Sequence, residues 1–442
     1  MFKGQTKIVN KKKTEKYLYF GAAVILCATL VVGMLSLMVN TKRNERKTAK
    51  IGGEIISTQT ESTGENIRVV LKTNGFQDIF HQKMSVSSES GILVSVGGES
   101  FEYGPEEMIE IYPENEWFQK GNIVIHPKES GKLLISSLKR GYGVPSYRGI
   151  LELYSTASGI VAVNELLLEE YLYAVVPSEM PSSYELEALK AQAVCARSYA
   201  ARQMETYSYP EYEAHVDDST KFQVYGNSEE KNNTVKAVDE TKGQKVWYNN
   251  NIIPTYYFST SGGNTTTSEA WGNQKSDENA YLKAVSVSDG GKDYEEKLPW
   301  YRWTANIEES TLSELIRRNT NQDIGQIENI EVTKRGDGDV AIQVVAMGSN
   351  GNVTIDTENK IRKALGGNGY TLEKQDGTVV DSKELLPSAF FDIEKQDHTY
   401  VIRGGGFGHG IGMSQNAANE MAKAGKTYKE ILQFFYHGIE LK

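Results

Sequence analysis

The sequence predicts an α+β protein, with a core helix and several short antiparallel sheets, preceded by one transmembrane helix. Three observations predict this class. Residues 17–39 form a run of 23 residues without a charged side chain, which is long enough to cross a bilayer as a helix. From Ile67 onward, short β-branched segments recur between Gly, Asn and Ser turns. One alanine-rich segment, residues 186–204, has helical periodicity instead.

Composition and charge limit the partners of this chain. It has 442 residues, of which 39% are hydrophobic and 24% charged, enough for a sizeable core. Residues 1–50 carry eleven Lys and Arg against two Glu, so the remaining 392 residues carry a net charge of −19. An acidic domain is a poor match for nucleic acid, because phosphates are neutralised by Lys and Arg. The composition favours a neutral partner such as a polysaccharide.

We expect four parts along the chain. They are a short cytoplasmic tail (1–16), a transmembrane helix (17–39), a polar linker (40–65) and an ectodomain (66–442). A cleaved signal peptide is the alternative for the apolar run, but no small-residue cleavage site follows it. Basic residues flank both of its ends, so charge alone barely sets the orientation. We expect a single-pass cell-membrane protein whose C-terminal domain is extracytoplasmic.

The ectodomain begins with strands. Four segments have the pattern of short strands: IRVVL from Ile67, GILVSV from Gly91, NIVIHP from Asn122 and KLLISSL from Lys132. Two further segments continue this pattern up to the stretch around Glu179: RGILELY from Arg148 and GIVAVNELLLEEYLYAVV from Gly159. The two cysteines, Cys27 and Cys195, are far apart, and Cys27 lies in the apolar run. No disulfide is therefore expected.

The core helix follows the strands. Ser182 and Glu185 have the spacing of a capping box, which predicts that the helix begins there. An apolar face recurs at three-and-four spacing, through Leu186, Leu189, Ala193, Ala196, Ala200 and Met204. We therefore expect this helix to be buried.

Later elements are marked by turns and short periodic runs. We expect a hairpin within 241–272 with its turn at 249–251, a helix over 310–318, a strand meander over 328–356, a short helix at 359–365, and two C-terminal helices separated by Gly425. The region of about 310–385 is expected to be a β-rich insertion or subdomain.

The first candidate for chemistry is Glu179, which stands between Pro177 and Pro181. Proline fixes its own φ and restricts the residue before it, so this carboxylate is expected to be rigid. We expect Val175, Val176 and Met180 to supply apolar surroundings that raise its pKa, as a proton donor requires. The N-terminus of the following helix would lower that pKa instead. A solvated loop residue is the alternative interpretation.

The second candidate is the glycine-rich segment GGGFGHGIGMSQ, residues 404–415. It has no G-x-G-x-x-G register and no Gly-Lys-Ser/Thr, which excludes a phosphate loop. The stretch GMSQN lacks the last glycine of a nucleophile elbow. The motif therefore does not support Ser414 as a nucleophile with His409 as its base. We expect a loop whose backbone approaches a ligand and holds His409 on a rigid turn. A structural crossover is the alternative.

No metal or cofactor is expected. The six histidines have neither H-E-x-x-H nor H-x-H spacing, and no Cys pair is present. His215, Asp217 and Asp218 are expected to lie in a solvated loop. The segment 259–272 combines hydroxyls, amides and Trp271, a mixture suited to sugars because an indole stacks on a pyranose face. An ordinary polar turn is the alternative there.

Four blocks together resemble the SpoIID/LytB family of bacterial cell-wall proteins: VVPSEMPSSYELEALKAQAVCARSYA (175–200), STKFQVYG (219–226), TYYFSTSGGNTTTSEAWG (255–272) and the segment 404–438. The resemblance extends roughly from Ile67 to Lys442. This family includes sporulation lytic transglycosylases that act on glycan stripped of its stem peptides, and also amidase enhancers. The chain departs from the family pattern at Tyr184, Cys195 and Phe222; the last stands where some relatives have Cys and argues against a thiolate-ligated metal.

The resemblance implies a membrane-anchored lytic transglycosylase of sporulation or engulfment, with Glu179 as general acid and base. A non-catalytic wall-binding enhancer of an amidase is the alternative. The implied partners are peptidoglycan glycan strands, with other wall hydrolases or sporulation membrane proteins, and no nucleic acid. The expected substrate-binding residues are Lys190, Gln192, Arg197, Tyr199, Gln223, Tyr225, Ser259, Gly262, Gly263, Trp271, His409 and Gln415. A single carboxylate suits this chemistry, whereas ordinary glycosidases use two.

Overall fold

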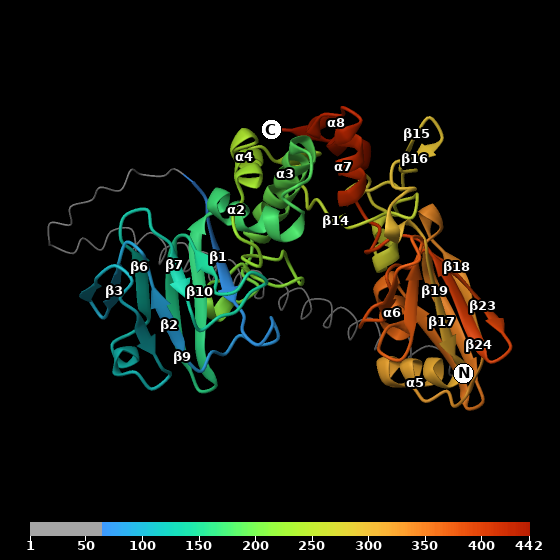
Figure 1. The fold of residues 1–442 in the computed structure, drawn as a ribbon, viewed down its shortest axis with the longest axis horizontal. Coiled ribbons are helices and arrows are strands. Elements are labelled where there is room, and N and C mark those ends of the chain that lie inside the picture. The colour runs from blue at the N-terminus through green and yellow to red at the C-terminus, as the bar shows by residue number, and fades with distance from the viewer. Residues whose placement is uncertain (1–63) are drawn as a thin grey trace, which may run out of the picture. The chain divides into compact units, whose positions relative to one another are not determined.

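Seven α-helices and seven sheets make up residues 64–442, the part of the chain that the computed structural model describes (Figure 1). The α+β class is confirmed for these residues. The expected tail, transmembrane helix and nearly all of the linker lie outside the described residues. Within 64–442, no helix combines the length and the apolarity needed to span a membrane.

The largest sheet has seven strands in the order β11-β1-β10-β9-β6-β3-β4. Its pairings are antiparallel, except that β1 and β11 run parallel. The strands are β1 (Asn66–Leu71), β3 (Ile92–Val96), β4 (Glu99–Tyr103), β6 (Ile123–Pro127), β9 (Ile150–Thr156), β10 (Gly159–Leu167) and β11 (Val216–Asp217). Strand β3 alternates buried and half-buried residues, as a sheet with one covered face requires.

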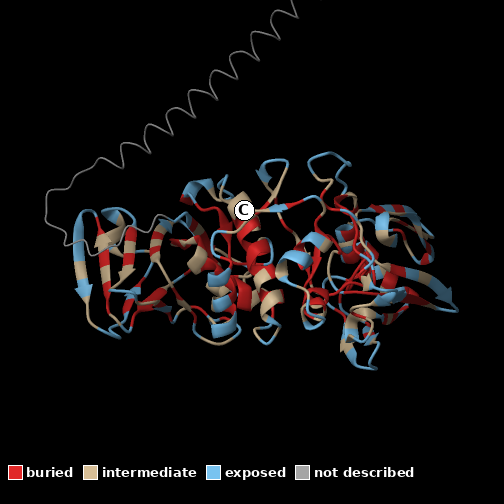
Figure 2. Ribbon diagram, turned by 90° about the horizontal axis from the view of Figure 1, so that it is seen from above, coloured by how far each residue is buried: buried red, intermediate tan, exposed pale blue. Residues whose placement is uncertain are grey.

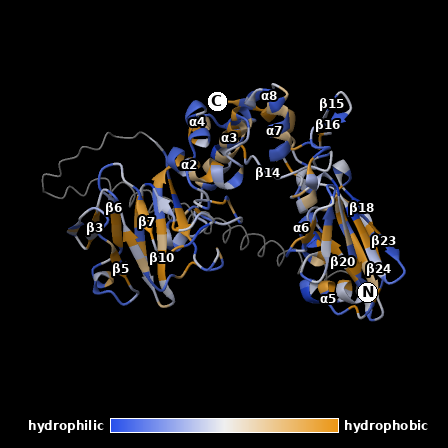
Figure 3. Ribbon diagram, viewed as in Figure 1, coloured by the Kyte–Doolittle hydropathy of each residue, from blue (hydrophilic) through white to orange (hydrophobic). Residues whose placement is uncertain are grey.

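A four-stranded antiparallel sheet follows, in the order β5-β2-β7-β8. Its strands are β2 (Met84–Ser87), β5 (Ile109–Ile111), β7 (Leu133–Ile135) and β8 (Ser146–Tyr147). The segments predicted as strands from Ile67 to Thr156 are confirmed, and the one that begins at Gly159 is a strand as far as Leu167. Figure 3 shows hydrophobic residues running along β7 and β10, and Figure 2 shows that strands and central helices hold most of the buried residues.

Helices α2 (Leu168–Glu179), α3 (Leu186–Gln203) and α4 (Asn232–Glu240) pack against one another. The predicted core helix is α3, and its alanines at 188, 191, 193 and 196 are fully buried. Their small side chains allow close approach of α2 and α4, and also of the C-terminal helices α7 (Gln415–Lys423) and α8 (Tyr428–Phe435). The separation of these last two at Gly425 is confirmed.

The predicted start of α3 is wrong. The helix begins at Leu186, with Glu185 as its N-cap residue and no side-chain cap. Ser182 lies in the preceding turn, and the backbone N–H of Glu185 donates to the side chain of Asn419, 2.9 Å away. The cap is therefore supplied by a distant helix, so the local capping pattern was misleading.

Helix α2 was not predicted. The pattern from Gly159 to Val176 was expected to continue as a strand up to the proline-bounded segment, but Leu168, Leu172, Val175 and Val176 are buried at helical spacing. Pro177 lies inside the helix, near its end. Glu179 is consequently the last residue of a helix and not a loop residue.

Two short pairings join the middle of the chain to its C-terminus. The predicted hairpin is formed by β12 (Val246–Tyr248) and β13 (Asn251–Ile252), and its turn residues Asn249 and Asn250 have φ of 49° and 62°. Strand β26 (Glu440–Leu441) pairs with β12. Strand β14 (Tyr257–Phe258) runs parallel to β25 (Met413–Ser414), just before α7. Not every sheet is therefore antiparallel.

The remaining elements form two further antiparallel sheets and two helices, besides the small β15 (Ser288–Asp289) and β16 (Lys292–Asp293) hairpin. One sheet has the order β22-β21-β17-β24-β23: β17 (Trp303–Glu308), β21 (Thr371–Lys374), β22 (Val379–Asp381), β23 (Phe391–Gln396) and β24 (Thr399–Gly404). The other is the predicted meander: β18 (Ile327–Arg335), β19 (Ala341–Gly348) and β20 (Gly351–Asp356). The predicted helices are α5 (Glu309–Thr320) and α6 (Glu358–Leu365). Strand β21 pairs with β17, which lies outside 310–385, and the subdomain boundary stays a prediction.

Candidate active site

All four sequence blocks meet at one cavity of about 340 Å³. The described residues that line it belong to the end of α2, to α3 and to the segments 220–224 and 255–257, with two single side chains from elsewhere. The lining residues are Glu179, Tyr199, Thr220, Lys221, Phe222, Gln223, Val224, Thr255, Tyr256, Tyr257, Trp271 and His409. Five of the predicted site residues are among them: Glu179, Tyr199, Gln223, Trp271 and His409.

Glu179 is held at this cavity through its carboxylate. One carboxylate oxygen accepts a hydrogen bond from the backbone N–H of Val224, 2.6 Å away. Burial raises the pKa of Glu179 to about 7, although the hydrogen bonds from Val224 and the Tyr257 hydroxyl act in the opposite direction. The raised pKa agrees with the sequence expectation, because Val175, Val176 and Met180 are all buried.

The expected opposition from a helix dipole is absent. Glu179 is the last residue of α2, so the nearest helix end is a C-terminus. A C-terminus carries partial negative charge and disfavours an ionised carboxylate. The helix therefore acts in the same direction as burial on the pKa of Glu179.

The end of α2 is fixed by Ser178. Its hydroxyl donates to the carbonyl of Ala174, 2.6 Å away, and accepts from the N–H groups of Asn227 and Ser228, each 3.1 Å away. This single hydroxyl joins the helix end to the segment that follows Val224. These hydrogen bonds fix the segment in addition to the constraint that the two prolines place on its backbone.

Two predicted glutamines are hydrogen-bonded to the backbone of Glu179, directly or through each other. The amide of Gln415 donates to the backbone carbonyl of Glu179, 3.0 Å away, and to Oε1 of Gln192, 3.3 Å away. Gln192 is fully buried and Gln415 nearly so. Neither belongs to the described lining of the cavity, so both position the glutamate and do not face a ligand.

Tyr257 is a residue of the site that was not predicted. Its side chain lines the cavity, and its hydroxyl accepts from Nε2 of Gln223, 3.1 Å away. The Gln223 amide oxygen in turn accepts from the hydroxyl of Tyr171, 3.4 Å away. A chain of polar groups therefore runs from Glu179 into the core. The sequence feature that could have indicated Tyr257 is the stretch TYYF (255–258) in the third block. That stretch does not distinguish Tyr257 from its neighbour Tyr256.

His409 has both ring nitrogens committed. Nε2 donates to the carbonyl of Tyr257 at 2.9 Å, and Nδ1 accepts from the N–H of Ile411 at 3.0 Å. Burial and the charge of Arg362 lower the pKa of His409 to about 3. The ring is therefore a neutral wall of the cavity, with Trp271 5.1 Å away between ring centroids.

Three further predicted residues, besides the two glutamines, do not line the cavity. Lys190 forms ion pairs with Glu187 and Glu240, both at 2.7 Å. Tyr225 is buried and donates to Oδ1 of Asn164, 2.7 Å away. Arg197 is fully buried and, like these two, is used within the fold.

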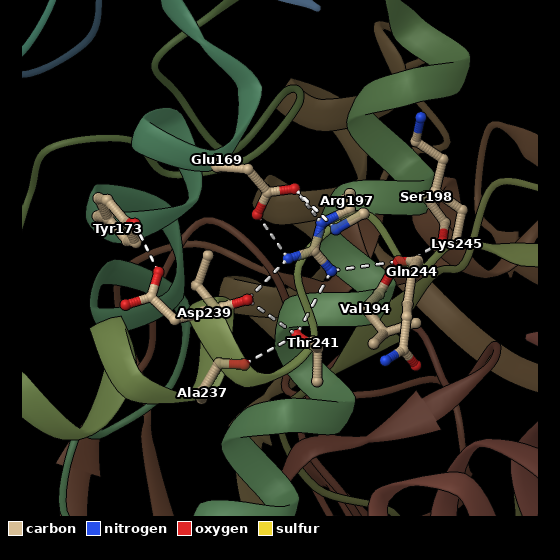
Figure 4. A network of polar contacts seen from close by, with 12 residues as sticks. Glu169, Tyr173, Val194, Arg197, Ser198, Ala237, Asp239, Thr241, Gln244 and Lys245 are labelled. Carbon is tan, nitrogen blue, oxygen red and sulfur yellow. Dashed lines mark hydrogen bonds and ion pairs between the residues drawn. The ribbon is translucent and has the colours of Figure 1, made fainter. Parts of the chain in front are cut away.

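Figure 4 shows the contacts of Arg197. Its guanidinium binds both carboxylate oxygens of Glu169, at 2.8 and 2.7 Å, and donates to the carbonyls of Val238 and Gln244, both at 3.2 Å. These partners connect α3 with α2 and with the end of α4. Arg197 therefore links α3 to α2 and α4 through hydrogen bonds and an ion pair. It is not among the described residues that line the cavity.

The loop of Ser259, Gly262 and Gly263 lies next to the C-terminal block. The carbonyl of Ser259 accepts from the N–H of Asn416 at 3.0 Å. A Cβ on Gly262 would come within 2.8 Å of the Gly405 backbone, so this glycine allows two loops to touch. None of the three belongs to the described lining of the Glu179 cavity.

Glu295 holds that loop in place and was also missed. It is 1% exposed, accepts from the N–H of Ser261 at 3.0 Å and from the hydroxyl of Ser414 at 2.8 Å, and binds the Ser261 hydroxyl. Burial raises the pKa of Glu295 to about 7 against these hydrogen bonds. Its sequence surroundings, DYEEKLPW, look like an ordinary polar stretch.

The expected solvated loop around Asp217 and Asp218 is wrong. Both carboxylates are fully buried. Asp218 pairs with Arg140 at 2.6 Å, and Asp217 accepts from the Tyr209 hydroxyl at 2.6 Å. Arg140 compensates the charge of Asp218, and Asp217 is satisfied by hydrogen bonds, as buried polar groups require.

Known proteins match the same regions. The family described as stage II sporulation protein (SpoIID) matches residues 156–248, and a domain of unknown function, DUF8618, matches residues 245–412. The first range includes Glu179 and Gln223, and the second includes Tyr257, Trp271 and His409.

Three relatives extend these matches. A stage II sporulation protein D of Bacillus subtilis (strain 168) is 32% identical over 330 residues, which cover 71% of this chain and 85% of that protein. An uncharacterized protein of Brachyspira hyodysenteriae is 31% identical over 301 residues, 67% of this chain and 72% of that protein. An amidase enhancer of Bacillus subtilis (strain 168) is 32% identical over 298 residues, 61% of this chain but 40% of that protein. On the extent and identity of these matches, the chain belongs to the SpoIID family.

Proposed function

We propose that this protein is a peptidoglycan lytic transglycosylase that cleaves glycan strands lacking stem peptides, in wall remodelling during sporulation. The observation that carries the proposal is Glu179, whose pKa is raised to about 7 in a cavity with aromatic walls. It is the one carboxylate among the described residues that line this cavity. A pKa close to neutral lets one group both donate and accept a proton.

In the first step Glu179 acts as an acid. Its proton passes to the bridging oxygen of the glycosidic bond as the bond from the anomeric carbon to that oxygen breaks. The leaving sugar departs with a new hydroxyl group. Glu179 is left as a carboxylate, and the hydrogen bond from Val224 stabilises that charge.

In the second step Glu179 acts as a base. The carboxylate removes the proton from the C6 hydroxyl of the cleaved sugar, and the C6 oxygen bonds to the anomeric carbon. The product has a 1,6-anhydro end, no water is consumed, and Glu179 is protonated again. Glycosidases that use water or a covalent intermediate need a second carboxylate about 5–9.5 Å from the first, and the described lining offers none.

The walls suit a sugar substrate. Tyr199, Tyr256 and Trp271 present aromatic surface, and Gln223 presents an amide. The indole N–H of Trp271 donates to Glu358, 3.0 Å away, which fixes the plane of the ring. Ring faces of fixed orientation pack against the C–H face of a pyranose, while the amide binds its hydroxyls.

We further propose that residues 17–39 anchor the protein in the cell membrane, with residues 66–442 outside the cytoplasm. That placement puts Glu179 on the side where peptidoglycan lies. The apolar run of 23 residues is the observation behind it. Protease accessibility of the C-terminal domain in intact cells stripped of wall would test it.

A second candidate function is the stimulation of a wall amidase without glycan cleavage. The relative named amidase enhancer, 32% identical over 298 residues, is the observation that favours it. Such a protein would use the aromatic cavity for binding, and Glu179 would not transfer protons.

The deciding experiment incubates the full chain with purified glycan strands, with and without stem peptides, and analyses products by mass spectrometry. We expect anhydro-ended fragments from bare glycan, and none from the Glu179→Gln variant. The variant should still bind glycan, which separates loss of chemistry from loss of folding. Stimulation of an amidase with no anhydro product from the wild type would instead favour the second function.

A further inference from the structure

A second cavity, of about 640 Å³, lies beside Phe407. The described residues that line it are Trp300, Arg362, Leu372, Lys374, Val380, Asp381, Lys383, Glu384, Leu385, Leu386, Pro387 and Phe407. Two of them, Phe407 and Leu385, are large apolar residues that are 37% and 36% exposed. Exposed apolar side chains gathered at a concave site mark a binding surface more often than isolated ones do.

This cavity shares a loop with the proposed active site. His409 lines the Glu179 cavity and Phe407 lines the second one, with only Gly408 between them. Two residues of chain span roughly 7 Å at most. A polymer bound at the first cavity therefore has the second within reach.

The shared loop is fixed on both sides. The backbone N–H and carbonyl of Phe407 pair with Thr260 at 2.8 and 3.0 Å, and the N–H of Gly408 donates to the carbonyl of Pro387 at 2.9 Å. A Cβ on Gly408 would come within 2.7 Å of Phe258. The exposed ring of Phe407 is thus presented by a rigid backbone, which lowers the entropy cost of binding.

Trp300 supports that ring. The two ring centroids are 4.9 Å apart at an interplanar angle of 43°. The Lys374 ammonium lies over the indole, 4.8 Å from its centroid. The half-buried indole therefore contacts both groups, and Phe407 is the more exposed of the two rings in the lining.

The charges around the second cavity balance. Lys374 and Lys383 stand against Asp381 and Glu384, while the guanidinium of Arg362 donates to the carbonyl of Leu386 at 2.9 Å and pairs with Glu358. A ligand here needs an apolar face for Phe407 and polar edges for these side chains, but no net charge. An uncharged sugar ring has that character.

We propose that the second cavity is a distal subsite that binds further sugar residues of the same glycan strand whose cleaved bond lies at Glu179. This inference rests on the proposed function for the identity of the strand. It adds that Phe407 sets a preference for long strands over short ones. A stem peptide is the competing occupant, and the experiment distinguishes the two.

The test compares three variants of the full chain. Phe407→Ala removes the exposed ring, Phe407→Trp retains an aromatic surface, and Val379→Ala is the control. Val379 is 59% exposed in β22, next to the cavity but outside its described lining. Cleavage is measured on short and long bare glycan oligomers. Binding of both, and of the free stem peptide, is measured by calorimetry in the Glu179→Gln background.

We expect Phe407→Ala to lower kcat/KM and affinity for long oligomers by on the order of three- to tenfold and to leave short oligomers unchanged. Phe407→Trp and Val379→Ala should behave as wild type. Equal losses on short and long oligomers would overturn the subsite, as would binding of the peptide in place of glycan. If the wild type cleaves nothing but Phe407→Ala still weakens long-glycan binding selectively, the subsite stands and the transglycosylase function fails.

Discussion

The side-chain amide of Gln415 donates a hydrogen bond to the backbone carbonyl of Glu179, with 3.0 Å between nitrogen and oxygen. That carbonyl is among the last four of α2, which have no partner within their own helix. Gln415 is the first residue of α7, 236 positions later in the chain. The C-terminal block therefore fixes the helix end that carries the proposed acid.

Replacing Gln415 with Ala should weaken both folding and catalysis. The carbonyl of Glu179 and the amide oxygen of Gln192 would lose a donor inside the protein, which costs about 1–3 kcal/mol of unfolding free energy. We expect kcat to fall while the pH profile keeps its midpoint, because the surroundings of the Glu179 carboxylate do not change. The control is Gln433→Ala, an exposed glutamine of α8. A loss of stability with full kcat would show that Gln415 does not position Glu179.

Replacing Glu179 with Gln should stabilise the fold at high pH. The folded pKa is about 7, above the ordinary value of about 4.3, so the folded state holds the proton more tightly. The stability that this group contributes is present at low pH and is lost as the pH rises from about 4 to 7. Glu179→Gln removes this loss, and we expect a gain of roughly 3–4 kcal/mol at pH 8 and almost none at pH 4.

Chemical denaturation of wild type and variant at several pH values would measure this effect. Glu102→Gln is the contrasting control, since the Lys128 ammonium lowers the pKa of Glu102. A lowered pKa gives stability that is present at neutral pH and lost in acid, so that variant should show the opposite trend, at small amplitude because the pair is exposed. Parallel stability curves for wild type and Glu179→Gln would contradict the raised pKa.

The sequence predicted what depends on local pattern. Alternating β-branched residues identified β1, β3 and β10, and the alanine-rich periodicity identified α3, because these signals are carried by neighbouring residues. Helix α2 was missed because Pro177 looked like a boundary, whereas the helix continues past it to Glu179. The Ser178 hydroxyl binds the Ala174 carbonyl one turn earlier and the N–H groups of Asn227 and Ser228, which lie far away in the sequence.

The site was predictable only where a residue stands in a recognisable block. Glu179 and His409 do, and they meet at the cavity. Glu295 lies outside every block, and its role exists only because Ser261 and Ser414 come together in three dimensions. Arg197 was expected near the cavity because the family resemblance implied it, but its partner is Glu169.

Replacing Tyr257 with Phe should shift the pH dependence of cleavage. The Tyr257 hydroxyl lowers the pKa of Glu179, against the larger effect of burial. Without it, the pKa of Glu179 should rise. Activity that requires the protonated acid is lost above that pKa, so the alkaline limb should move to higher pH. An unshifted limb in kcat/KM profiles would show that the two side chains do not interact.

Replacing Arg197 with Ala should destabilise the helices around α3 without a specific effect on substrate binding. The change leaves Glu169 without its partner in a mostly buried setting, which typically costs about 3–5 kcal/mol. Arg202→Ala is the matched control on the same helix, since its pair with Glu205 is exposed and worth little. Denaturation midpoints measure the loss. A raised KM with unchanged stability would restore Arg197 to the substrate-binding residues.

Replacing His409 with Gln should leave the pH dependence of cleavage in place. The pKa of His409 is lowered to about 3 by burial and by Arg362, so the ring is neutral throughout the working range and cannot be the group that titrates near 7. Its nitrogens bind the Tyr257 carbonyl and the Ile411 N–H; a glutamine amide can also donate and accept, but it does not fill the space of the ring beside Trp271. We therefore expect a lower kcat, a modest loss of stability and an alkaline limb at the wild-type pH.

The control for this substitution is His437→Gln, at a histidine outside the described lining of the cavity. Loss of the limb in His409→Gln would assign the titration to His409 and remove Glu179 from that role.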